Sequence, residues 1–166
     1  MAAEQNNNQD VEIREIEPQP ILSIRGKIKT PQLGEAMGDR IGALSSYLEQ
    51  SGAQPAGPPF VRYHAFDESN ADFELGIPVV EAVAGEGRIE AGELAGGPAI
   101  TTWHIGAHDK LGEAYARVEA ALNEHGREPD GPPREVYHWI DFTKGGDDPG
   151  MPDPTTWRTE LILPVK

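Results

Sequence analysis

Residues 57–64 read GPPFVRYH and residues 131–138 read GPPREVYH, so five of eight positions are identical between the two segments. A second match follows in the same order, between FELGIPV at 73–79 and TELILPV at 159–165, which share a glutamate, a leucine, a proline and a valine. Two ordered matches in one chain predict an internal duplication. We place the first repeat at about residues 11–83 and the second at about 87–166.

Each GPP segment follows a stretch with the period of an amphipathic helix. Apolar side chains recur three or four positions apart in both: Leu33, Met37, Ile41, Leu44 and Leu48 in the first repeat, Leu111, Tyr115, Val118 and Leu122 in the second. Thr30 and Asp109 are the predicted N-caps. Gly52 and Gly126 are predicted to end the helices, because glycine adopts the left-handed conformation that often follows a last turn.

Short extended segments flank both helices. Two precede each helix, and those before the second, GRIEAGEL and AITTWHI, are predicted to join at a Gly96-Gly97 turn. Two more follow each helix, so the order strand, strand, helix, strand, strand occurs twice. This order predicts an α+β protein with an antiparallel sheet and one main helix per repeat. Residues 1–10 are a predicted disordered leader, and the loop at 143–156 is an insertion in the second repeat.

The composition excludes several classes of function. The chain has 14 basic and 28 acidic residues, a formal net charge of -14, whereas contacts to phosphates need clustered lysine and arginine, so we expect no direct nucleic-acid partner. Cysteine is absent, which rules out thiolate nucleophiles and cysteine-based metal sites. The chain has neither a secretion signal nor a run of about 18 apolar residues. We therefore expect a cytoplasmic protein without membrane contact.

Metal and cofactor motifs are weak. His104 and His108 have a spacing that suits metal only on a helix, and Gly106 between them favours a turn. The glycines of GEGRIEAGELAGG do not lead from a strand into a helix, as a phosphate-binding loop would. We predict no metal and no cofactor.

Strand alternation assigns side chains to faces of the sheet. Along REVYHWIDF, Val136 and His138 point to one side, and Glu135, Tyr137 and Trp139 to the other. The last strand has an apolar side that contains Leu161 and Leu163, which leaves Glu160 on the opposite side. If the valine side of the first segment is its core side, Tyr137, Trp139 and Glu160 share one face, with Tyr63 equivalent in the first repeat.

Two interpretations of that face remain open. A carboxylate among aromatic rings is a site for an organic cation, since charge attraction and cation–π contacts add together. Alternatively, Glu160 is an ordinary acidic residue paired with a neighbouring arginine or lysine.

The ordered set LGEAY at 111–115, GPP-x-x-x-Y at 131–137 and W-R-T-E-L-x-x-P-V at 157–165 resembles the GyrI-like small-molecule-binding domain of the SOUL/GyrI-like superfamily. This domain is the effector-binding part of multidrug-sensing transcription regulators, and it also occurs alone. The first half, from TPQLGEAM to GPPFVRYH, looks like the family's first repeat. The resemblance therefore covers nearly everything after the leader.

The resemblance implies a concave sheet with a cleft between two pseudo-symmetric halves. It implies that Glu160 pairs with hydrophobic cations in that cleft, where Tyr137, Trp139, Tyr63 and Trp103 would form the walls. Some stand-alone relatives hydrolyse cyclopropane-bearing compounds, and an enzyme of that kind would use Glu160 and Tyr137 as catalytic residues. A third alternative is sequestration of a protein partner. Regulation of transcription would require a separate DNA-binding chain.

Overall fold

The computed structural model describes residues 11–107, 110–138, 155 and 157–166. Predictions about the leader, Asp109, Trp139 and most of the 143–156 loop lie outside this part of the chain. The elements are β1 (Val11–Ile16), β2 (Gln19–Lys29), α1 (Leu33–Ser51), β3 (Phe60–Phe66), β4 (Asn70–Pro78), β5 (Glu90–Leu94), β6 (Gly97–Ile105), α2 (Leu111–Glu124), β7 (Arg134–Tyr137) and β8 (Arg158–Pro164). The predicted α+β class and the doubled order of elements are confirmed.

The helix ends agree with the sequence at their C-termini and differ at the start of α1. Gly52 and Gly126 adopt the left-handed conformation, with φ angles of 78° and 64°. Thr30 does not cap α1, because a short 3-10 turn at Thr30–Gln32 precedes the helix. The Thr30 hydroxyl donates instead to the carbonyl of Asp67, at 2.8 Å. It therefore fastens the start of the helix to the loop between β3 and β4.

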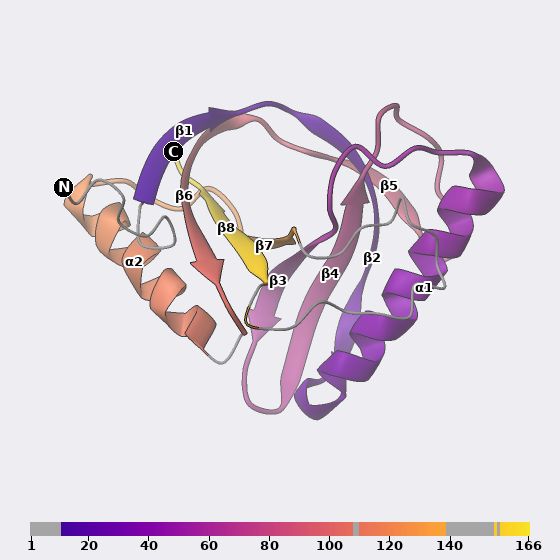
Figure 1. Ribbon diagram of the computed structural model, residues 1–166, viewed down its shortest axis with the longest axis horizontal. Coiled ribbons are helices and arrows are strands. Elements are labelled where there is room, and N and C mark those ends of the chain that lie inside the picture. Colours follow the sequence, from indigo (N-terminus) through magenta and orange to yellow (C-terminus); the bar gives the residue numbers. More distant parts are fainter. Residues whose placement is uncertain (1–10, 108–109, 139–154, 156) are drawn as a thin grey trace.

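The eight strands form one antiparallel sheet in the order β1-β6-β8-β7-β3-β4-β2-β5. The repeats exchange their first strands: β1 pairs with β6 of the second repeat, and β5 pairs with β2 of the first. The predicted β5–β6 turn is therefore wrong as a hairpin, since the chain passes at Gly96 from one edge of the sheet toward the other. The β1–β2 and β5–β6 connections form two arches over the strongly curved sheet (Figure 1).

Backbone contacts repeat between the two halves. The amide of Val79 donates to the carbonyl of Pro20 at 2.9 Å, and that of Val165 to Pro98 at 3.0 Å. The halves meet where β3 pairs with β7, with Val61 directly opposite Glu135. The sheet is therefore continuous through a pseudo-twofold centre.

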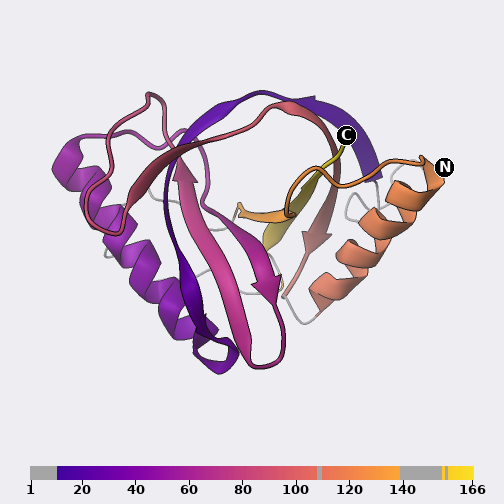
Figure 2. The same ribbon diagram turned by 180° about the vertical axis from the view of Figure 1, so that it is seen from behind.

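Both helices pack on the same side of the sheet. α1 covers β2 and β4, and α2 covers β6, β8 and β1, so that β3 and β7 run between them (Figure 1, Figure 2). We call the side to which Val61, Glu135 and Leu161 point the helix face. The opposite side, to which Val136 and Glu160 point, is the far face. In the described part of the chain, no helix is long and apolar enough to cross a membrane.

Candidate functional site

The predicted assignment of side chains to faces is right for one of the two strands that carry the predicted site and wrong for the other. In β8 the prediction is right, because Leu161 and Leu163 pack in the core cluster with α2. In β7 the predicted sides are reversed: Tyr137 belongs to the core cluster with α1, whereas Val136 packs on the far face. Since Val136 is the strand partner of Glu160, Tyr137 and Glu160 point to opposite faces of the sheet. The prediction that they share one face is wrong.

Glu160 is buried on the far face and already has a cationic partner. It forms a salt bridge with Arg14 of β1, and His138 Nε2 lies 3.2 Å from its other oxygen. Trp103 is its partner on β6, and the indole ring of Trp103 contacts the guanidinium of Arg158. This agrees with the interpretation of Glu160 as an acidic residue paired with a neighbouring arginine.

The first repeat has an equivalent arrangement at Glu74. Its carboxylate accepts hydrogen bonds from Ser23 at 2.6 Å and Arg62 at 3.0 Å, and it contacts His64 Nε2 at 2.9 Å. Burial tends to raise the pKa of Glu74, but these partners outweigh burial and hold the pKa below its ordinary value. Both far-face glutamates are thus compensated within the protein.

A different carboxylate lies at the centre of the helix face. Glu135 is only 4% exposed, and it accepts hydrogen bonds from the hydroxyls of Tyr115 on α2 and Tyr137 on β7. The Tyr137 contact measures 2.7 Å. Tyr63 of β3 hydrogen-bonds with Tyr137 and extends the group. We call these four residues the tyrosine–carboxylate cluster.

The cluster is electrostatically unbalanced. No salt bridge to Glu135 occurs among the described residues. Burial raises the pKa of the Glu135 carboxyl, and the two tyrosine hydroxyls offset only part of that rise. Burial and the nearby Glu135 charge likewise raise the pKa of Tyr63, Tyr115 and Tyr137. Chemically, the site can accept a cation or hold a proton.

The sequence matches the family model of the GyrI-like small molecule binding domain over residues 9–166. The chain belongs to this family. Comparison with curated proteins gave no match.

Solved structures share the fold of this GyrI-like domain. The EcmrR C-terminal domain is 23% identical, with a TM-score of 0.76 over 95% of this chain and 97% of that one. EcmrR in its DNA complex is 23% identical, with a TM-score of 0.77 over 95% of this chain. The match spans only 57% of the EcmrR chain. A hydrolase from Listeria innocua is 13% identical, with a TM-score of 0.66 over 98% of this chain and 94% of that chain. SAV2435 bound to tetraphenylphosphonium is 13% identical, with a TM-score of 0.61 over 95% and 94%.

Within this GyrI-like domain, the predicted site residues separate into two groups. Tyr63 and Tyr137 come together in the tyrosine–carboxylate cluster. Glu160 and Trp103 lie on the far face, and Trp139 is outside the described residues. His104 Nε2 donates a hydrogen bond to the Ala107 carbonyl at 2.8 Å, as expected for a turn.

The sequence patterns do not predict the hydrogen bonds that Glu135 accepts from Tyr115 and Tyr137. In the sequence, Tyr115 belongs to the apolar stripe of its helix, and Glu135 lies on the same side of its strand as Tyr137. One signal was available. The repeats read GPPFVRY and GPPREVY, so Glu135 takes the position of Val61, and a carboxylate at a position that is apolar in the other repeat marks a local departure from core packing.

Proposed function

We propose that this domain binds a hydrophobic organic cation at the tyrosine–carboxylate cluster. Glu135 is the counter-ion, and the rings of Tyr63, Tyr115 and Tyr137 contact the ligand. The observation that carries the proposal is a buried carboxylate whose described partners are phenol hydroxyls and include no cation. Glu160, predicted as the counter-ion, already pairs with Arg14, and we therefore assign the role to Glu135.

The energetics favour a cationic ligand. An ionised carboxylate is costly to bury unless an opposite charge compensates it. At about 4 Å and an effective dielectric of about 20, a bound cation attracts the carboxylate by about 4 kcal/mol before desolvation. Each aromatic face adds about 0.5–2 kcal/mol. SAV2435, which has the same fold at 13% identity, was solved with tetraphenylphosphonium, and this lipophilic cation is a suitable probe.

The test is calorimetric titration with tetraphenylphosphonium and with neutral triphenylphosphine oxide. We expect Glu135→Gln to weaken binding of the cation about 10- to 100-fold, which corresponds to about 1.4–2.8 kcal/mol, and to leave binding of the neutral compound nearly unchanged. Glu160→Gln is the matched control, because it removes a buried carboxylate from the opposite face. Equal affinity in wild type and Glu135→Gln, or loss only in Glu160→Gln, would overturn the assignment.

A second candidate function is hydrolysis at the same cluster. The observation that favours it is the raised pKa of Glu135 beside the Tyr137 hydroxyl, an arrangement that suits general acid–base catalysis. A hydrolase from Listeria innocua shares the fold. In this candidate Glu135 replaces Glu160 as the carboxylate that activates water, and Tyr137 orients the substrate. Mass spectrometry of a cyclopropane-bearing substrate tests it: a ring-opened, hydrated product should form with wild type and not with Glu135→Gln.

A further inference from the structure

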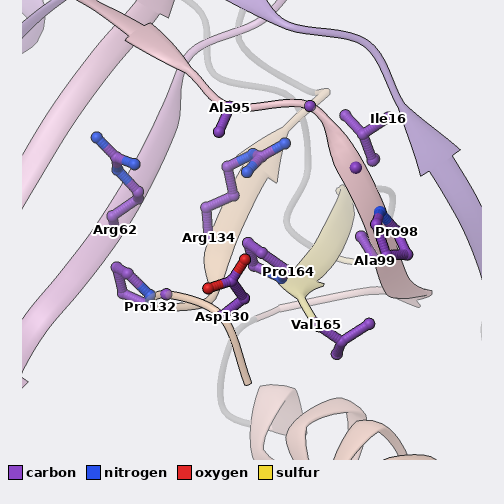
Figure 3. Close-up of a pocket in the computed structure, with 13 residues that line it drawn as sticks. Ile16, Arg62, Ala95, Pro98, Ala99, Asp130, Pro132, Arg134, Pro164 and Val165 are labelled. Atoms are coloured by element: carbon purple, nitrogen blue, oxygen red, sulfur yellow. The ribbon is translucent and has the colours of Figure 1, made fainter. Parts of the chain in front are cut away.

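A cavity of about 160 Å³ lies on the far face, beneath the two arches where the repeats meet. Its lining includes Arg62 of β3, Arg134 of β7 and Asp130, together with Pro98, Pro132 and Pro164 (Figure 3). A single water needs only about 10–15 Å³ of such volume. The cavity is therefore large enough for a small organic molecule.

Arg134 is the polar group that distinguishes this cavity. The residue is only 6% exposed, and it has no hydrogen bond or salt bridge to any described residue. Its guanidinium points into the cavity (Figure 3). Most of the Arg134 side chain is buried, but its nitrogen atoms are open to the cavity, so an acceptor group of a ligand can reach them.

None of the charged residues described next to Arg134 forms a salt bridge with it. Arg62 lies directly opposite Arg134 across the β3–β7 pair, and its own charge is compensated by Glu74 at 2.8 Å. The charge of Glu160 attracts Arg134 over a longer distance, but the Glu160 carboxylate forms its salt bridge with Arg14. Burial, together with the positive charge of Arg62, lowers the pKa of Arg134 to about 10. At neutral pH the guanidinium is still charged.

We propose that this cavity is a binding site for a small organic monocarboxylate. The ligand's two oxygens accept hydrogen bonds from the Arg134 guanidinium, and its hydrocarbon part contacts Pro98, Pro132 and Pro164. This site is independent of the proposed cation site, because it lies on the opposite face of the sheet and selects the opposite charge.

A carboxylate fits the cavity better than a phosphate. The planar fork of one guanidinium matches the two oxygens of a carboxylate. Only one guanidinium without a protein partner lies among the described lining residues, and the Asp130 carboxylate is also on the lining, so a dianion would meet about twice the repulsion that a monoanion meets. The proline rings provide an apolar surface that suits an alkyl group.

The experiment compares propionate and isobutyrate with propionamide, a neutral isostere, and with inorganic phosphate, all at constant ionic strength. We expect the carboxylates to raise the melting temperature of wild type in a saturable way, since a ligand of the folded state stabilises it. Propionamide should have no effect, and amide NMR signals of Gly97 and Gly131, which line the cavity, should shift with propionate. A larger response to phosphate than to carboxylates would overturn the proposed ligand class.

Variants of Arg134 provide the second part of the test. Arg134→Met should melt at a higher temperature than wild type without ligand, because it removes a charge that burial destabilises, and it should no longer respond to propionate. Arg134→Lys keeps the charge without the fork and should bind about tenfold more weakly. Arg158→Gln, an exposed arginine on the same face, and Glu135→Gln should respond like wild type. An undiminished response in both Arg134 variants, or no response in wild type, would overturn the proposal.

Discussion

Val61 and Glu135 face each other across the central β3–β7 pair, and they also occupy equivalent positions in the two repeats. The pseudo-twofold centre of the sheet therefore lies between them. Tyr63 and Tyr137, which are equivalent as well, lie on the same face beside this pair. The scaffold is symmetric at this point and the chemistry is not, because only one of the two central positions carries a carboxylate.

The raised pKa of Glu135 predicts a characteristic pH dependence of stability. Below the ordinary glutamate value of 4.5, the carboxyl is protonated in both the folded and the unfolded chain and costs little. As the pH rises from the unfolded-state pKa of Glu135 through its folded-state pKa, the wild type loses stability, whereas Glu135→Gln does not. The loss is about 1.4 kcal/mol for each unit by which the folded-state pKa exceeds the unfolded-state pKa. Urea denaturation of both proteins between pH 4 and 8 measures this. A stability difference that does not change with pH would contradict the prediction.

Glu74 should behave in the opposite way. Its pKa is lowered, so its contribution to folding is present above its ordinary pKa of 4.5 and is lost as the pH falls through the folded-state value. Replacing it by alanine leaves the charge of Arg62 without its partner, and we expect a loss of about 3 kcal/mol at pH 7. Chemical denaturation measures the loss. Asp39→Ala, which breaks an exposed salt bridge to Arg88, is the control and should cause no measurable change.

The sequence predicted those features that depend on local periodicity. The helix stripes, the glycines that end both helices and the apolar side of β8 were all correct, because they follow from residues a few positions apart. Which strands pair depends on residues far apart in the chain, and the alternation of side chains along one strand gives no information about its partner. GRIEAGEL and AITTWHI therefore predicted a hairpin, whereas the fold pairs β5 with β2 and β6 with β1.

The same limit explains the error at the site. Along REVYHWIDF, Val136 shares its side with Ile140 and Phe142, so hydrophobicity favoured the valine side as the core side. Within the four residues of β7, Arg134 and Val136 alternate with Glu135 and Tyr137, and hydrophobicity does not separate the two sides. The glutamate side of β7 faces the helices, where Tyr115, from a helix that precedes β7 in the sequence, supplies a hydroxyl donor to Glu135. Tyr63 lies with Tyr137 on one face, as the repeat predicts, because the equivalence of the two residues needs no choice of side.

Gly96 is predicted to be required where the two arches meet. An added Cβ would lie 2.7 Å from the carbonyl oxygen of Ile16 and 2.8 Å from the ring of Pro18, so the two connections would have to move apart. We expect Gly96→Ala to lower the free energy of unfolding by about 1–3 kcal/mol. Gly42→Ala on α1 is the matched control: its Cβ would meet open space, and replacing a helical glycine should stabilise by about 0.5–1 kcal/mol. Thermal melts of the two variants should shift in opposite directions, and a shift in the same direction would contradict this account.

Tyr115 is predicted to control the protonation of Glu135 and, through it, the affinity for cations. Its hydroxyl donates to the carboxylate, and this hydrogen bond favours the ionised form. Tyr115→Phe keeps the ring and removes the donor, so the pKa of Glu135 should rise further and tetraphenylphosphonium binding should require a higher pH. Carbon NMR of the labelled glutamate carboxyl measures the first effect, and titrations between pH 5 and 8 measure the second. Tyr47→Phe is the control, because the Tyr47 hydroxyl donates to the carbonyl of Ala84, away from the cluster. If Tyr115→Phe leaves both the Glu135 pKa and the pH profile of binding unchanged, the cluster does not act as a unit, and Tyr115 contributes only its ring.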